Sequence, residues 1–198
     1  MVRLLSLVVT GAIVYVIVCG VQVVEASRLS AVPSAVHPAS AIVVLGQPVA
    51  KADRADLISR LGQAVLLYRD HRSSRVIVTW SPPPAGSVGS IAYEKKFLVG
   101  PGVPRRDLTF VAAPDASTAL SKTAKLLGKG TSVIVVTDAI DALWTQGAGA
   151  GDGLSVAVSP PPSSKKLVFT ELGPFVRETT GVAVGRIFGF GRISWAAH

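Results

Sequence analysis

The chain starts with a long apolar segment. Residues Leu4 to Val24 are 21 consecutive uncharged positions, LLSLVVTGAIVYVIVCGVQVV. As a helix rising about 1.5 Å per residue, this segment is long enough to cross the roughly 30 Å hydrocarbon core of a bilayer. The apolar region of a secretory signal has only about 7–15 residues, so an uncleaved signal anchor over residues 1–25 is favoured over a cleaved leader.

The orientation of this anchor rests on the charges that flank it. Arg3 precedes the segment, whereas Glu25 and Arg28 follow it and cancel. Positive charge tends to stay on the cytoplasmic side, so we expect a single-pass protein of the cell membrane with its C-terminal domain outside the cytoplasm. Cys19 falls within the span, where we expect it to face lipid. Residues 26–40 hold two prolines and four serines without a hydrophobic period, and they predict a tether.

From residue 41 onward, short apolar runs alternate with longer segments of helical period. The runs are rich in β-branched residues and nearly continuous, a pattern typical of strands buried on both faces. They comprise Ala41–Gly46, Arg75–Trp80, Leu108–Ala112, Val133–Thr137 and Leu154–Ser159. The helical segments between them are Arg54–Arg69, Ser90–Val99, Ser117–Leu127 with Ser117 as the expected N-cap, and Asp138–Gln146, which ends in a glycine-rich run.

Alternating strands and helices predict an α/β fold, a Rossmann-like three-layer domain with a mostly parallel sheet over residues 41–198, preceded by one transmembrane helix. The tail contains a further apolar segment, from Leu167 to Ile193, in which Pro174 can begin a helix. Two interpretations of this closing helix stay open: it packs on the domain, or it docks against the bilayer or the anchor helix. Its charged residues exclude a second span.

Composition and charge narrow the function classes. Charged residues make up 16% of the chain against roughly 25% in average proteins, and 49% are hydrophobic, which excludes disorder as the main state. A single cysteine cannot form an internal disulfide. The net charge of +8 is dispersed along the chain rather than concentrated beside aromatic residues, so we expect no nucleic-acid partner. Besides the membrane itself, anionic envelope polymers or another envelope protein are the partners that suit an external basic domain.

The chain lacks the residues that most enzyme mechanisms require. His37, His71 and His198 follow none of the predicted strands, which leaves a Ser-His-Asp triad without a base and zinc without a ligand cluster. What remains is a pair of carboxylates, Asp138 and Asp141, that share a helix face at i, i+3. Asp138 is expected to cap its helix, and the alternative is that both bind a divalent cation as weak catalytic candidates. No cofactor is otherwise predicted.

Two proline-rich turns follow predicted strands. Ser81-Pro82-Pro83-Pro84 comes after the second strand and Ser159-Pro160-Pro161-Pro162 comes after the fifth. Polyproline is stiff and leaves its carbonyl groups free, so these turns either wall the crevice as rigid loops or offer a docking surface.

Four motifs resemble the YdcF/SanA/ElyC-like family, a group of Rossmann-like domains often carried behind one N-terminal span. AIVVLG is similar to the family's first strand and glycine turn, and RLGQAVLLYRDHRSSRVIVTW to its arginine-led helix and second strand, with Arg60 and Tyr68 in register. Gly102-Val103-Pro104 resembles the end of a family helix. PFVRETTG is similar to the family's last helix, with its Arg-Glu pair at Arg177 and Glu178.

The chain departs from that family at most polar positions. Gln47 replaces a second glycine, Ser81-Pro82 replaces a Gly-Gly, and only Thr118 survives from an Asn-Thr…Glu-Asn motif. The resemblance therefore implies a degenerate member. We expect a membrane-anchored cell-envelope protein that binds a ligand or partner without catalysis, linked to envelope integrity. The expected ligand-binding residues are Gly46, Arg60, Thr118 and Thr137.

The alternative is an envelope enzyme acting on a phosphorylated or pyrophosphate-linked cell-wall precursor. In that case Asp138 and Asp141 would hold the cation, Gly46 would admit the phosphate close to the backbone, and Arg60 would pair its charge.

Overall fold

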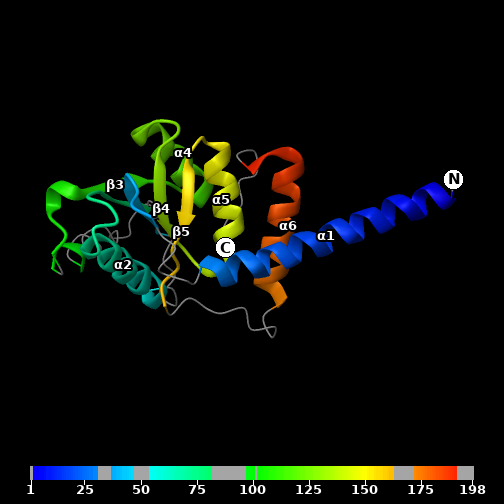
Figure 1. The fold of residues 1–198 in the computed structure, drawn as a ribbon, viewed down its shortest axis with the longest axis horizontal. Helices are drawn as coiled ribbons and strands as arrows, with labels where there is room; N and C mark the ends of the chain where they lie inside the picture. Colours follow the sequence, from blue (N-terminus) through cyan, green and yellow to red (C-terminus); the bar gives the residue numbers. More distant parts are fainter. Residues whose placement is uncertain are drawn as a thin grey trace, which may run out of the picture.

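A computed structural model describes residues 2–30, 37–46, 54–81, 97–100, 102–162 and 172–190 of the chain. Within these residues a five-stranded, all-parallel sheet lies between helices, and one long apolar helix extends away from it (Figure 1). The predicted α/β, Rossmann-like class is therefore confirmed.

All five predicted strands form. The strand order is β3-β2-β1-β4-β5. The strands are β1 (Ala41–Leu45), β2 (Val76–Trp80), β3 (Leu108–Ala112), β4 (Ser132–Val136) and β5 (Ser155–Val158). In the centre of the sheet, Ile42 pairs with Val76 of β2 and with Ile134 of β4. Every residue of β1 is buried, as the continuous β-branched run predicts for a strand covered on both faces.

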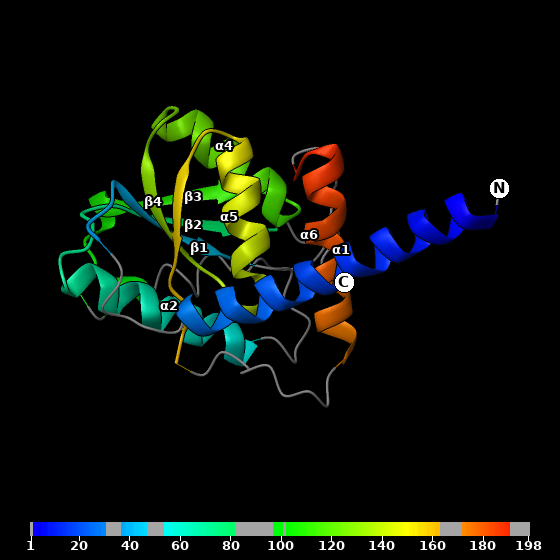
Figure 2. The same cartoon turned by 45° about the vertical axis from the view of Figure 1, so that its right-hand side comes forward.

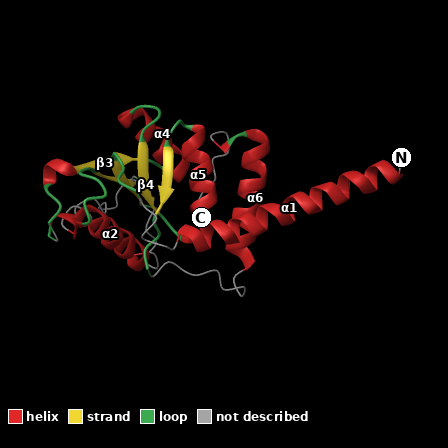
Figure 3. Ribbon diagram, in the orientation of Figure 1, coloured by secondary structure: helices red, strands yellow, loops and turns green. Residues whose placement is uncertain are grey.

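Helices cover both faces of the sheet (Figure 3), and alternate residues of the strands belong to two separate cores. Ile42 and Val44 face α2 (Arg54–Arg69), whose apolar face covers one side of the sheet. Val43 and Leu45 point to the other side, which α4 (Ala116–Leu127) and α5 (Ala142–Gly151) cover. The result is the three-layer arrangement that the alternation of strands and helices predicts.

The helix ends differ from expectation at two places. The N-cap of α4 is Asp115, whose carboxylate accepts the backbone N–H of Thr118 at 2.7 Å, so the prediction of Ser117 is wrong by two residues. A carboxylate one residue before the helix reaches the free N–H groups, and Ser117 is already inside the first turn. The segment after β4 begins with a 3-10 turn, η4 (Ala139–Asp141), and α5 then continues through the glycine-rich run to Gly151. A second 3-10 turn, η3 (Arg105–Asp107), precedes β3.

The N-terminal helix α1 (Val2–Ser30) has a span from Ser6 to Ala26 that is long and apolar enough to cross a membrane. Its N-terminal half projects freely from the domain, whereas its C-terminal half lies against α5, η4 and the last helix (Figure 2). The start of the expected tether, Ala26–Ser30, continues this helix, and residues 31–36 lie outside the described part.

One face of α1 is part of the protein core. Tyr15, Cys19 and Val23 lie at i, i+4 and i+8, and the last two are completely buried against the domain. The expectation that Cys19 faces lipid is therefore wrong. The domain covers it because the helix docks along this stripe.

The tail forms α6 (Leu172–Phe188), which packs against α1, α5 and η4. Tyr15 donates a hydrogen bond from its hydroxyl to the Ala183 carbonyl at 3.2 Å, and Arg186 donates to the Gln22 side-chain oxygen. The closing helix thus packs on the domain and docks against the anchor helix at once.

Candidate functional site

The order of the strands defines where a ligand crevice belongs. The chain passes from β1 to β2 through α2 on one face, and from β4 to β5 through α5 on the other, so the topology switches between β1 and β4. In open α/β sheets, ligands bind outside the carboxyl ends of the strands at this point. Gly46 directly follows β1, and Thr137 and Asp138 directly follow β4.

Arg60 occupies this switch point. It comes from α2, and its side chain is 7% exposed. One guanidinium nitrogen donates to the Leu45 carbonyl at 2.8 Å, and the other donates to the Asp138 carboxylate at 2.8 Å. The arginine therefore joins the ends of β1 and β4, because Leu45 is the last residue of β1 and Asp138 lies just beyond β4. Such a charge-assisted bond is among the stronger ones in proteins.

A second charged pair lies beside the first. Asp141, at the end of η4, is 3.9 Å from a guanidinium nitrogen of Arg177 on α6. The neighbouring Glu178 is 3% exposed and accepts the backbone N–H of Trp144, the third residue of α5, at 3.1 Å. Because α6 contributes two of these side chains, the tail helix is tied to the segment that follows β4.

The environment of these carboxyl groups perturbs their titration. Burial, with a further contribution from the charge of Asp138, raises the pKa of Asp141 to about 6 against the attraction of Arg177 and Arg60. Burial, with the charge of Asp141, raises the pKa of Glu178 to about 8, although the Trp144 N–H and Arg177 oppose this shift. Near neutral pH, Glu178 is therefore predominantly protonated.

The expected capping role of Asp138 is wrong. No side-chain cap is formed by Asp138 at η4 or by Asp141 at α5, because both carboxylates face arginines instead. Among the described residues, no group of three or more His, Cys, Asp or Glu side chains is arranged to hold a metal ion. The paired aspartates, as a cation site, stay a prediction in which Arg60 and Arg177 compete directly with the metal.

Of the four expected ligand-binding residues, three lie at the switch point. Gly46 is required there by packing, because a Cβ atom on it would lie 2.2 Å from the Thr79 carbonyl oxygen of β2. Thr137 is 2% exposed. Thr118 instead lies beyond β3, the edge strand, where its hydroxyl donates to the Asp115 carboxylate at 2.9 Å.

The proline turn after β5 is packed rather than presented. Ser159, Pro160 and Pro161 are buried, and Gln63 of α2 donates to the Ser159 hydroxyl at 3.0 Å. This turn therefore forms a wall beside α2 and offers no docking surface before Pro162. The turn after β2 lies outside the described residues from Pro82 onward.

No protein-family model, no curated protein and no solved structure matches this chain.

Two residues of the charged network were not among the expected site residues. Arg177 and Glu178 lie in the tail, far along the chain from Arg60 and Asp138. The resemblance to a family Arg-Glu pair singled them out, yet it assigned them no role. A stronger signal was available in the sequence, since a consecutive charged pair in an otherwise apolar helix needs buried partners.

Proposed function

We propose that the protein is a membrane-anchored, single-pass protein of the cell envelope whose degenerate YdcF-like α/β domain binds a ligand or partner without catalysing a reaction. The domain lies outside the cytoplasm, and its ligand is an anionic envelope polymer or another envelope protein. The observation that carries the proposal is the engagement of Arg60 by Leu45 and Asp138.

Arg60 and Asp138 are the groups that a phosphate-processing enzyme would place on substrate and metal. Here each is bound to the other, and the pair links the ends of β1 and β4. Breaking this pair costs about 2–3 kcal/mol, less than for a fully buried pair because the Asp138 carboxylate is one-third exposed, so the binding of a phosphate or cation would have to overcome that energy. An intact pair therefore favours a structural role for Arg60 and Asp138 at the switch point, with the ligand bound elsewhere on the domain.

The anchor part of the proposal rests on α1, whose apolar span runs from Ser6 to Ala26. Its topology is tested by labelling a Lys129→Cys variant with a membrane-impermeant maleimide in intact cells. Lys129 lies exposed between α4 and β4, and the native Cys19 is buried, so background labelling is low. Labelling without cell lysis is expected. Labelling only after lysis would place the domain in the cytoplasm and contradict this part.

The binding part is tested on the full chain in detergent micelles with poly(glycerol phosphate) as the polymer probe. A ligand at about 100 times its Kd stabilises the folded state by about 2.7 kcal/mol, which raises the Tm of a chain this size by roughly 5–10 °C. We expect a salt-sensitive shift that an Asp138→Asn variant retains. A flat response to the polymer, together with a Mg²⁺-dependent shift that Asp138→Asn loses, would overturn the proposal.

One observation favours the alternative enzyme, which would act on a phosphorylated or pyrophosphate-linked precursor. Carboxyl groups with raised pKa values cluster at functional sites, and Asp141 and Glu178 lie together at the switch point. In that function, a divalent cation at Asp138 and Asp141 would displace the arginines. The same Mg²⁺ titration separates the two functions, because only the enzyme requires the cation.

A further inference from the structure

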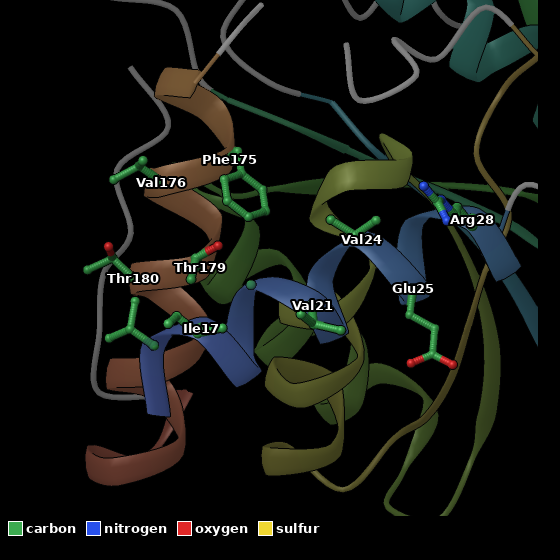
Figure 4. Close-up of a pocket in the computed structure, with 11 residues that line it drawn as sticks. Ile17, Val21, Val24, Glu25, Arg28, Phe175, Val176, Thr179 and Thr180 are labelled. Atoms are coloured by element: carbon green, nitrogen blue, oxygen red, sulfur yellow. The ribbon is translucent and has the colours of Figure 1, made fainter. Parts of the chain in front are cut away.

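An apolar groove of about 750 Å³ lies between the anchor helix and the tail helix (Figure 4). Its walls are the aliphatic side chains on one face of α1, between Val16 and Val24, and Phe175 and Val176 of α6. Gly20 forms its floor beside the Phe175 ring, which a Cβ atom there would approach to 3.0 Å. The groove therefore opens along the membrane-spanning segment itself.

The depth of the membrane places this groove within one leaflet. Only the residues of α1 before Tyr15, which is the first to hydrogen-bond the domain, project freely. Counted from Leu4, which follows the charged Arg3, the residues up to Val14 extend only about 17 Å, whereas the hydrocarbon core is roughly 30 Å thick. The hydrocarbon must therefore also surround the next turns of α1, to about Val23, where α6 crosses them.

The surface of α6 fits this immersion. Val176, Ile187 and Phe188 are each more than half exposed, and the polar Thr180 and Arg186 are also exposed, whereas another face of the helix packs against α1 and α5. Polar side chains begin on α1 at the expected headgroup level, with Gln22 bonded to Arg186. Apolar side chains on a helix beside a membrane span are covered by lipid without a free-energy cost, whereas contact with water would be unfavourable for them.

The polar groups of the groove lie at two levels along α1. Glu25 and Arg28 are exposed at its outer end, and among the described residues neither forms an ion pair. Thr179 lies deeper, beside Gly20; it is 4% exposed, and its hydroxyl has no hydrogen-bond partner among the described residues. A buried hydroxyl without a partner costs free energy until an acceptor arrives. Val21 lies between the two levels, and Ile17 continues the apolar wall at the inner end (Figure 4).

We propose that the α1–α6 groove binds a zwitterionic phospholipid of the surrounding bilayer. The phosphate and amine of the headgroup face Arg28 and Glu25, the glycerol lies beside Val21, the ester carbonyl accepts the Thr179 hydroxyl, and the acyl chain continues along Ile17. This inference rests on the anchoring proposed above and is independent of what the switch point binds.

The test uses the full chain in vesicles of phosphatidylethanolamine and phosphatidylglycerol with a trace of either lipid carrying a diazirine in its acyl chain. After irradiation, mass spectrometry maps the adducts. We expect adducts concentrated on groove residues such as Ile17 and Phe175, above the level at the freely exposed Ile13. An even distribution over α1 shows only bulk lipid contact and would overturn the proposal without any variant.

Two matched variants sharpen the result. Gly20→Leu fills the groove, whereas Gly11→Leu makes the same change on the same helix where nothing lies within 4 Å. Groove adducts should be lost only in Gly20→Leu, and equal labelling of the two variants contradicts the proposal. In the native chain, phosphatidylethanolamine should label the groove about fivefold better than phosphatidylglycerol, and Glu25→Gln should remove this preference. Equal labelling by both lipids in the native chain would refute the headgroup assignment.

Membrane extraction separates this proposal from the anchoring itself. If alkaline carbonate releases the chain from membranes, the anchor and the groove site both fail. If the chain stays in the membrane while Gly20→Leu labels like Gly11→Leu, only the groove site fails.

Discussion

Replacement of Glu178 by glutamine should make the protein more stable at alkaline pH and flatten its pH dependence. Glutamine is isosteric with the protonated carboxyl and still accepts the Trp144 N–H. The pKa of Glu178 is raised from 4.5 to about 8 by burial, so the folded state holds a proton that the unfolded state has released. Stability therefore falls as pH rises from about 4.5 to 8 and levels off above the folded-state pKa.

The size of the effect follows from the two pKa values. Asp141 titrates in the same direction with a pKa raised to about 6, so most of the change between pH 6 and 8 comes from Glu178. Across that window the linkage relation gives a loss of about 2 kcal/mol in the free energy of unfolding. For a chain of this length the corresponding fall in Tm is roughly 4–8 °C.

The assay is thermal unfolding of the full chain in micelles, followed by tryptophan fluorescence at several pH values from 5 to 9. Glu25→Gln is the matched control, because it removes an exposed carboxyl from the same kind of helical position. The control should keep the native slope between pH 6 and 8, and Glu178→Gln should lose it. If Glu178→Gln keeps the slope, the carboxyl is ionised in the folded protein and the argument from burial is wrong.

Substitutions at three further sites, two of them with a matched control, test the packing and polar contacts described above by chemical unfolding in micelles. Arg60→Ala should lower the free energy of unfolding by about 2–3 kcal/mol. This is less than for a fully buried pair, because the partner carboxylate is one-third exposed. An unchanged unfolding midpoint would show that the pair is dispensable. Gly46→Ala should lower the free energy of unfolding by about 1–3 kcal/mol, because its Cβ atom clashes with Thr79. The control Gly62→Ala lies on α2 with open space around it and should raise the free energy of unfolding by up to about 1 kcal/mol. A change of the same sign in both variants would contradict the packing argument. Asp115→Ala should cost about 1 kcal/mol as a lost N-cap, and Asp115→Asn should retain most of it.

The sheet was predictable because its signal is local. Each central strand is a run of β-branched residues, and burial on both faces of the sheet requires such a run. The same holds for α2, whose bounds, Arg54–Arg69, match the predicted segment because its apolar positions repeat with the helical period. The cap of α4 was missed because Asp115 and Ser117 are both favourable cap residues, and only the backbone path decides between them.

The candidate site was predictable only in part, because its contacts join distant segments. Arg60 and Asp138 are 78 positions apart, and they meet because β1 and β4 are neighbours in the sheet. The strand order could have placed the two side chains together. The sequence does not tell, however, whether they would face a ligand or bind each other. The link from Asp141 to Arg177 was further out of reach, since it depends on how α6 returns to the domain over α1.

Helix α1 contains the apolar span proposed as the anchor, and it also packs into the α/β domain. Cys19 and Val23 are completely buried in the core that also contains Trp144 and Val182, so the anchor helix completes one layer of the α/β domain. Burial of two such side chains contributes about 3 kcal/mol or more, out of the 5–15 kcal/mol that typically separates folded from unfolded states. A chain starting at Arg28 should therefore aggregate or unfold at lower temperature than the full chain in micelles, with its α5 and α6 surface exposed. A soluble fragment with the native Tm would show instead that α1 merely rests on a finished domain.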